Sequence, residues 1–222
     1  MSDKGVLFIV SGASATGKDT VIAQVMKEYG AKARLSVSMT TREPRGSEKD
    51  GEDYFFVSVE QFEKNILENQ MLEYAKYGKN YYGTPAEPVK KWLSEGNIVF
   101  LIIEVQGAAI VRANFPEAKS IFILPPSMKA LEERLRKRGT ENEEAIKTRL
   151  RIAQDEIKRA GEYDYIVMND RLETAVKDVT SICQYEHRIK NNTVISVNCV
   201  QNAEKLKKDN MINKISEVIC NA

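Results

Sequence analysis

The sequence is poor in the residue types on which many enzyme active sites depend. Its 222 residues include one histidine, His187, and three cysteines, Cys183, Cys199 and Cys220. Because the only histidine lies in a charged helical segment, we exclude histidine-based metal sites and Ser-His-Asp triads. The cysteines are odd in number and form no Cys-x-x-Cys pair, so we expect free thiols and a cytoplasmic location.

Excess charge and long apolar runs are also lacking. The 33 Lys and Arg residues balance 32 Asp and Glu residues, which leaves a formal net charge of +1. This balance offers no global attraction to nucleic acid or to a membrane, so any anion site must be local. No apolar run approaches the roughly 20 residues that span a bilayer, and residues 1–4 lead straight into the first apolar run without room for a signal peptide. We therefore expect neither nucleic acid nor a membrane as a partner.

Short apolar runs alternate with amphipathic segments along the chain. Runs typical of buried strands are residues 6–10, 98–105, 120–124 and 165–168. Helical patterns cover residues 108–114, 128–138, 143–162 and 173–189. The alternation predicts an α/β fold, with a parallel sheet covered by helices on both faces.

Residues 34–86 interrupt this alternation. They contain short strand-like runs at 35–40, 53–57 and 71–77 and a helical run at 59–68. We interpret them as an inserted subdomain with a mixed sheet. The core domain would then comprise residues 1–33 and 87–190.

Two further segments stand out. Residues 134–151 are rich in arginine and are predicted to form a mobile lid. Residues 191–222 are predicted to form an extension with a strand at 193–200 and an amphipathic helix at 203–219. This extension would either dock on the domain or form the interface of a homo-oligomer.

A glycine-bounded loop follows the first apolar run. It reads Gly12-Ala13-Ser14-Ala15-Thr16-Gly17-Lys18 and fits the pattern G-x-x-x-x-G-K. Glycines permit backbone angles that a Cβ forbids, so successive N–H groups can form an anion nest at the positive end of the following helix. A chance match in a strand-to-helix turn is the alternative, but the flanking strand and helix patterns are both present. The loop therefore predicts binding of a nucleoside triphosphate, with Lys18 on the outer phosphates.

The position after Lys18 departs from the pattern. Asp19 stands where serine or threonine is expected, and Thr20 follows it. Aspartate is a good Mg²⁺ ligand, directly or through water, but its charge is unfavourable near phosphates unless a cation lies between. Our hypothesis is that Asp19 and Thr20 share the metal and phosphate contacts.

Four polar runs in residues 34–86 offer groups for a second ligand. They are Ser38-Met39-Thr40-Thr41-Arg42-Glu43-Pro44-Arg45, Asp50-Gly51-Glu52-Asp53-Tyr54, Leu72-Glu73-Tyr74-Ala75 and Asn80-Tyr81-Tyr82-Gly83-Thr84. The paired N–H donors of an arginine guanidinium match the spacing of two phosphate oxygens. A carboxylate can accept both N–H donors of guanine while a hydroxyl donates to O6. Adenine would leave such groups unpaired, a mismatch that can discriminate by roughly 10⁴–10⁵. The runs predict a phosphorylated ligand carrying guanine.

These motifs, in this order, resemble the guanylate kinase family. The resemblance also includes Glu104-Val105-Gln106-Gly107 and Arg134-Leu135-Arg136-Lys137-Arg138-Gly139-Thr140, and it covers roughly residues 5–188. It implies a P-loop NTPase-like sheet with a GMP-binding insert and an arginine-rich lid. It also implies transfer of the γ-phosphoryl group of ATP to GMP or dGMP, in guanine nucleotide recycling, with Mg²⁺ accompanying ATP.

The resemblance implies a role for each site residue. ATP would contact Gly12, Ala13, Ser14, Ala15, Thr16, Gly17, Lys18, Asp19, Thr20 and Asn169. The GMP phosphate would contact Arg42, Arg45, Tyr54 and Tyr82, the guanine would contact Ser38, Glu73 and Thr84, and Glu104 would lie near GMP. The catalytic set would be Lys18, Arg42, Arg134, Arg138 and Arg149.

The family pattern is not matched everywhere. Two acidic residues commonly precede the Val-Gln-Gly run at alternate positions, and here Ile102 replaces the first while Glu104 is the second. Our hypothesis is that Asp19 compensates for Ile102. Two other functions stay open: a ribose bisphosphate kinase-like enzyme, since that family also uses Gly-Lys-Asp, and a non-catalytic guanylate-kinase-like binding module. Glu73 favours a guanine ligand over ribose bisphosphate. Lys18 favours an enzyme over a non-catalytic binding module.

Overall fold

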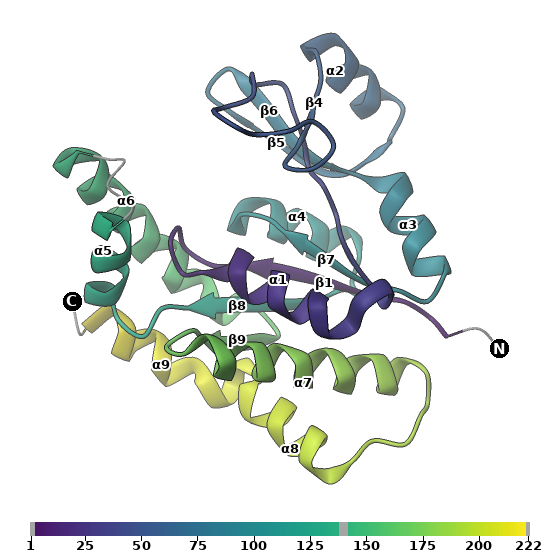
Figure 1. The fold of residues 1–222 in the computed structure, drawn as a ribbon, viewed down its shortest axis with the longest axis vertical. Helices are drawn as coiled ribbons and strands as arrows, with labels where there is room; N and C mark the ends of the chain where they lie inside the picture. Colours follow the sequence, from purple (N-terminus) through teal and green to yellow (C-terminus); the bar gives the residue numbers. More distant parts are fainter. Residues whose placement is uncertain (1–2, 138–141, 221–222) are drawn as a thin grey trace.

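The chain forms two sheets of different kinds. The computed structural model describes residues 3–137 and 142–220 (Figure 1). The larger sheet has five strands in the order β2-β7-β1-β8-β9, and every neighbouring pair is parallel. Its strands are β1 (Val6–Ser11), β2 (Ala33–Leu35), β7 (Ile98–Ile102), β8 (Lys119–Leu124) and β9 (Tyr165–Met168). The predicted α/β fold with a parallel sheet is confirmed.

Helices cover both faces of this sheet because alternate residues of each strand point to opposite faces. In β1, Phe8 packs with Val21 and Ile22 of α1 on one face, whereas Ile9 packs on the other. The first face carries α1 (Lys18–Tyr29), α7 (Leu172–Lys190) and part of α8 (Val197–Leu206). The second carries α3 (Ala86–Ser94), α4 (Val105–Asn114), α5 (Met128–Lys137), α6 (Glu143–Lys158) and α9 (Lys208–Cys220).

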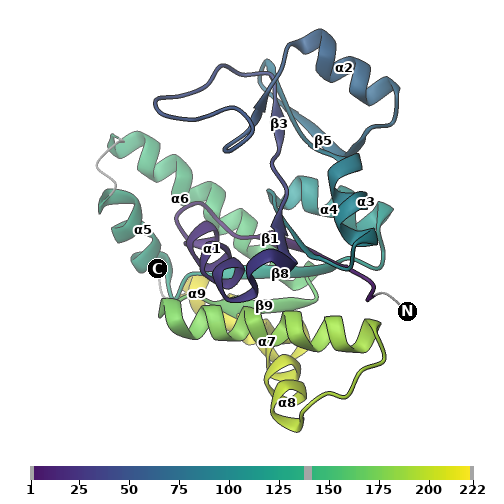
Figure 2. The same ribbon diagram turned by 45° about the vertical axis from the view of Figure 1, so that its right-hand side comes forward.

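The second sheet is mixed, as predicted, and stands above the first in Figure 2. Its strand order is β4-β3-β6-β5, in which β3 and β4 are parallel and the other pairs are antiparallel. These strands are β3 (Met39–Thr40), β4 (Phe55–Phe56), β5 (Met71–Tyr77) and β6 (Asn80–Pro85), with helix α2 (Val59–Leu67) packed beside them.

The strand predicted at residues 35–40 is wrong as a single element. The Ser36 amide still donates to Phe100 O in the large sheet at 2.9 Å, whereas Ser38 O already accepts from Phe55 in the small sheet at 2.8 Å. The chain therefore changes sheets between Ser36 and Ser38. The strand predicted at residues 98–105 is too long, because it ends at Ile102 and α4 begins at Val105.

The C-terminal extension contains no strand at residues 193–200, so that prediction is wrong. Helix α8 begins at Val197 because the Ser196 hydroxyl accepts from the Cys199 amide and caps it. The single helix predicted at 203–219 is also wrong, since α8 and α9 are separated at Lys207. There the backbone is extended and pairs with Tyr165 of β9, so the extension covers the end of an edge strand.

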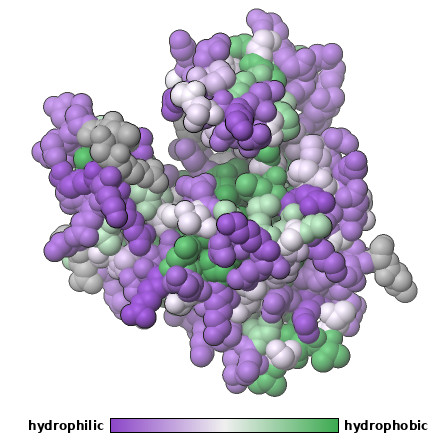
Figure 3. All heavy atoms as spheres, in the orientation of Figure 1, coloured by the Kyte–Doolittle hydropathy of each residue, from purple (hydrophilic) through white to green (hydrophobic). Residues whose placement is uncertain are grey.

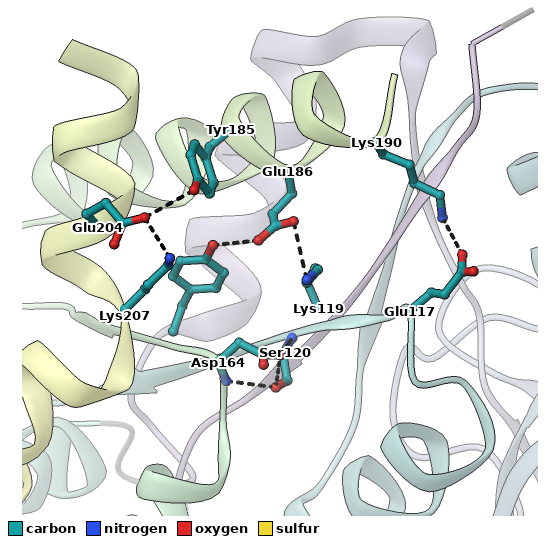
Figure 4. A network of polar contacts seen from close by, with 10 residues as sticks. Glu117, Lys119, Ser120, Asp164, Tyr185, Glu186, Lys190, Glu204 and Lys207 are labelled. Atoms are coloured by element: carbon teal, nitrogen blue, oxygen red, sulfur yellow. Dashed lines mark hydrogen bonds and ion pairs between the residues drawn. The ribbon is translucent and has the colours of Figure 1, made fainter. Parts of the chain in front are cut away.

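A polar network lies where the extension meets the core (Figure 4). On the core side, the buried carboxylate of Glu186 in α7 accepts from Tyr165 Oη at 2.5 Å and pairs with Lys119 at 3.5 Å. Nearer the surface, Glu204 accepts from Tyr185 Oη at 3.1 Å and from Lys207 Nζ at 2.6 Å. The extension is thus docked on its own chain. Assembly of two copies through its exposed side chains stays a prediction.

Packing against the core anchors α9, the last helix of the extension. Ile215 and Val218 of α9 are buried, and α9 packs against α6 and the 3₁₀ turn Arg159–Glu162 that ends it. Within the part of the chain described here, none of the helices has the length and apolar character of a membrane span.

Two tyrosine variants test the buried network. We expect Tyr165→Phe to lower the free energy of unfolding by about 1–3 kcal/mol, because it removes the hydroxyl donor to Oε1 of buried Glu186. The matched change Tyr185→Phe should cost less than about 1 kcal/mol, because Glu204 is only half-buried, so water can replace the lost donor, and it still accepts from Lys207. Urea unfolding followed by circular dichroism measures both, and equal losses would contradict a special role for the buried pair.

Candidate active site

The glycine-bounded loop connects the carboxyl end of β1 to the start of α1. Gly17 is the N-cap of α1 with φ 84°, and Ala15 also has a positive φ of 66°. A Cβ on Gly12 would lie 2.6 Å from Ile123 O, and one on Gly17 would lie 2.6 Å from Asn169 Nδ2. Both positions therefore require glycine, as the motif predicts.

Groups from distant parts of the chain brace this loop. Asn169, just after β9, donates its Nδ2 proton to Thr16 O at 2.7 Å, and the Thr16 hydroxyl donates to Ala13 O at 2.8 Å. Arg134 of α5 donates to Thr16 O at 3.3 Å and to Asn169 O at 2.8 Å. The segment after β9 and helix α5 thus both fix the loop.

The other predicted lid arginines differ in what they contact. Arg149 of α6 donates to Ser14 Oγ at 3.1 Å, so both α5 and α6 reach the loop. Arg136 instead pairs with Glu132 and Glu143 at the surface, as expected for a solvated helix face. Arg138 lies outside the described residues.

The predicted metal-binding pair lies in the first turn of α1 and is open to solvent. The Asp19 side chain is 74% exposed and lies 3.8 Å from Lys18 Nζ, and Thr20 is exposed beside it. Among the described residues, no cluster of three or more His, Cys, Asp or Glu could hold a metal ion. Mg²⁺ typically keeps several waters and takes one or two protein ligands plus substrate phosphates. The oxygen donors of Asp19 and Thr20 fit a site of that type.

A separate cavity of about 390 Å³ lies between the mixed sheet and the core. In Figure 3 the surface is hollowed below the upper lobe, which is formed by the mixed sheet and α2. The cavity brings together residues from both sheets. Its lining is Ser38, Arg42, Arg45, Tyr54, Glu73, Ala75, Tyr82, Ile102, Ile103, Glu104 and Gly107. It contains seven of the eight residues predicted for the second ligand, and the eighth, Thr84, contacts one of them.

Glu73 of β5 is the buried carboxylate of this cavity. Its side chain accepts from Thr84 Oγ1 at 2.7 Å, and burial raises its pKa, with a further increase from the charge of Glu104. A Cβ on Gly107 would lie 2.8 Å from Glu73 Oε2. The start of α4 therefore leaves space for this carboxylate, a role for Gly107 that the sequence did not reveal.

Arg42 is a second buried charged residue of this cavity. Its guanidinium carbon lies 4.9 Å from the centroid of the Tyr54 ring and 5.6 Å from that of Phe56. Nη1 and Nη2 donate to the two oxygens of Glu48, at 2.6 and 2.8 Å. The Arg42 guanidinium, followed by the Arg45 amide, lowers the pKa of Glu48 to about 2. The sequence interpretation did not include Glu48.

Glu156 of α6 is a second residue that the interpretation missed. Burial raises its pKa to about 7, the charge of Glu104 adds to this, and Lys18 and Arg159 oppose it. Glu104, which lines the cavity, also raises the pKa of Glu73. One signal in the sequence could have identified Glu156. It directly precedes Ile157, which lies on the buried face of an amphipathic helix.

Comparison with known proteins gives one consistent result. A protein-family model described as Guanylate kinase matches residues 4–186. The chain is 47% identical over 187 residues to "Guanylate kinase" of Oceanobacillus iheyensis and 48% identical over 187 residues to that of Streptococcus thermophilus. Each match covers 84% of this chain and 90% of the relative. The crystal structure of guanylate kinase from Anaplasma phagocytophilum matches with a TM-score of 0.68 and 30% identity, over 84% of this chain and 88% of that one.

Titration of Glu156 tests the electrostatics of the site. We expect its carboxyl ¹³C NMR signal to titrate near pH 7, and Glu104→Gln to lower the midpoint but keep it above 4.5, because burial is the larger cause. Since the folded pKa is raised, the contribution of Glu156 to stability is complete below about pH 4.5 and is lost as the pH rises through about 7. Exposed Glu144→Gln is the control, and a Glu156 midpoint near 4.5 would contradict the burial.

Proposed function

The chain belongs to the guanylate kinase family and is an ATP:GMP phosphotransferase, and we propose how its two sites divide the reaction. The observation that carries the division is that the phosphate-binding loop and a separate cavity lined by Arg42 and Glu73 adjoin each other. Ser11, directly before the loop, donates to Ile103 O at 2.7 Å, and Ile103 lines the cavity. ATP would bind the loop and GMP the cavity.

Residues 12–20 would hold the phosphates of ATP. Backbone N–H groups of the loop and the N-terminus of α1 favour anions, and Lys18 adds a cation. The oxygens of Asp19 and Thr20 would hold Mg²⁺ together with water and the nucleotide. When bound, Mg²⁺ neutralises negative charge on the phosphate oxygens. Asn169 would contact ATP from the adenine side while its amide braces Thr16.

Guanine would be read at the inner end of the cavity. An ionised Glu73 can accept from both the N1 and N2 donors of guanine, and the Ser38 hydroxyl can donate to O6. Thr84 has a single hydroxyl proton and gives it to Glu73. We therefore assign Thr84 the orientation of that carboxylate. The raised pKa of Glu73 is a consequence of the burial that makes its recognition of guanine selective.

The phosphate of GMP would lie at the other end, against Arg42, Arg45, Tyr54 and Tyr82. Arginine forks bind phosphate in a fixed orientation, and the tyrosine hydroxyls add neutral donors. Because this phosphate is already an anion near neutral pH, its oxygen can attack without a general base. The remaining task is alignment with the γ-phosphorus and neutralisation of charge.

Lid arginines would supply that neutralisation. Arg134 and Arg149 already contact the loop from α5 and α6, which supports their placement around the transferring group. Arg138, outside the described residues, belongs to the same proposed set. Arginines in this role contribute roughly 10³–10⁵ in rate, and closure over them keeps water from acting as the acceptor.

The two alternative functions lack such support. The pairing of Glu73 with Thr84 serves a purine base better than ribose bisphosphate, and the intact loop with two lid arginines on it suits an enzyme better than a binding module. The free thiols of Cys183, Cys199 and Cys220 fit a reducing compartment, which supports the proposed cytoplasmic location.

An acceptor assay tests this function. With ATP and Mg²⁺ in a coupled ADP-release assay, we expect turnover with GMP and dGMP but not with AMP or ribose bisphosphate. Glu73→Gln should raise KM for GMP by about 10- to 150-fold, since hydrogen bonds to charged groups are worth about 1.5–3 kcal/mol. Glu63→Gln, at an exposed glutamate of the same lobe, is the control. An enzyme without GMP-dependent turnover would overturn the proposal.

A magnesium titration tests Asp19. We expect Asp19→Ala to raise the Mg²⁺ concentration needed for half-maximal rate by about tenfold, because one charged ligand is lost. Asp19→Ser should show a smaller change, since serine retains an oxygen donor. Glu28→Gln, exposed in the last turn of the same helix, controls for surface charge. If neither Asp19 variant alters the magnesium requirement or turnover, Asp19 has no metal role.

A further inference from the structure

The roles proposed above leave one carboxylate of the second site unexplained. Glu48 lies in the long connection between β3 and β4 and does not line the cavity. Its oxygens nevertheless accept three hydrogen bonds from the segment that does. Nη1 and Nη2 of Arg42 donate at 2.6 and 2.8 Å, and the Arg45 amide donates at 2.8 Å. One carboxylate therefore ties together both arginines proposed for the GMP phosphate.

The pattern of these bonds determines which edge of the Arg42 guanidinium can still donate to a ligand. A guanidinium has five N–H donors. Both protons of Nη1 are used, one by Glu48 and one by Glu43 O at 2.9 Å, and one proton of Nη2 is used by Glu48. The Nε proton and the second Nη2 proton are committed to neither glutamate. These two protons share one edge of the group, and that edge has the fork geometry that matches two phosphate oxygens.

We call the Glu48 carboxylate, with its bonds to Arg42 and to the Arg45 amide, the clamp. The burial of Arg42 explains why the clamp is needed. Arg42 is only 9% exposed, and the rings of Tyr54 and Phe56 lie beside its guanidinium. A buried guanidinium without a partner is unfavourable, so before substrate arrives it requires a counter-ion. Glu48, which does not itself line the cavity, provides one through Nη1 and Nη2. Arg42 can then remain charged and correctly turned in the empty site.

We propose that Glu48 is a positioning residue for phosphoryl acceptors, which fixes Arg42 so that its Nε–Nη2 edge faces the incoming phosphate. The proposal rests on the assignment of this cavity to GMP. It also gives the Glu48 carboxylate a second task, since its bond to the Arg45 amide shapes the turn that brings Arg45 to the cavity.

A competing interpretation predicts the opposite change in GMP binding when Glu48 is removed. If the Glu48 carboxylate occupied the place of the substrate phosphate, it would be displaced on binding, and its removal would strengthen GMP binding. Two observations favour the clamp: Glu48 does not line the cavity, and it holds the Arg45 backbone as well as the Arg42 side chain. A third reading, in which Glu48 only stabilises the connection between β3 and β4, predicts equal effects on every ligand of the cavity.

Steady-state kinetics of the full chain separate these readings. We expect Glu48→Gln to raise KM for GMP by tenfold or more and to leave KM for ATP within twofold of wild type. Glu48→Asp, which keeps the charge, should recover part of the loss. Glu52→Gln, an exposed glutamate of the same connection, should match wild type. Unchanged or lower KM for GMP in Glu48→Gln would overturn the clamp.

Guanosine distinguishes positioning from general damage because it has the base but not the phosphate. As a competitive inhibitor against GMP, guanosine should bind wild type and Glu48→Gln with the same Ki. A Ki that rises in step with KM would reduce Glu48 to a structural residue and overturn the proposal.

A double-mutant cycle identifies Arg42 as the partner. Lysine cannot form the fork, so Glu48→Gln should have at least fivefold less effect on KM for GMP in an Arg42→Lys background than in wild type. Independent effects would also overturn the clamp. Turnover of wild type with GMP tests the function itself, so failure of the function and failure of this inference give different results.

Discussion

One buried amide holds together the parts of this protein that must meet for phosphoryl transfer. The Asn169 side chain, at the end of β9, donates to the carbonyl of Thr16 inside the loop, and Arg134 of α5 binds both residues through their carbonyl oxygens. Parallel strands place their carboxyl ends at one edge of the sheet, so these segments are brought together by topology alone. The hydrogen bonds then convert that proximity into a fixed geometry, in which an arginine of α5 reaches the loop.

The second site depends on contacts between a small sheet and the large one. Glu73 belongs to β5 of the mixed sheet, yet the space for its carboxylate exists because Gly107 of α4 has no side chain. Arg42 and Glu48 form a self-contained ion pair within the same lobe. The cavity is therefore shaped partly by the core and partly by the lobe. Any movement of the lobe against the core would change the surroundings of Glu73 more than those of Arg42.

Sequence patterns were sufficient where chemistry is local. Short motifs indicated the glycine requirement at Gly12 and Gly17 and the buried strands. They also indicated the eight residues predicted for the second ligand, of which seven line the cavity. What failed depends on tertiary contacts that local patterns do not encode. Lys207 interrupts a helical pattern because its backbone pairs with Tyr165, far away in the chain. Glu156 gains its significance from Glu104, which is also distant, and Glu48 from Arg42, which is only six residues away but is not indicated as a partner by any short motif.

The pairing at Lys207 also bears on how the edge of the large sheet is protected. Strand β9 is an edge strand, and Lys207 pairs with Tyr165 at its start. An edge strand presents unpaired N–H and C=O groups that can recruit another chain, and covering such an edge is one way in which proteins prevent this. Detachment of the extension would therefore expose Tyr165 to pairing with a second chain, so the docking of α8 and α9 also protects the molecule from aggregation.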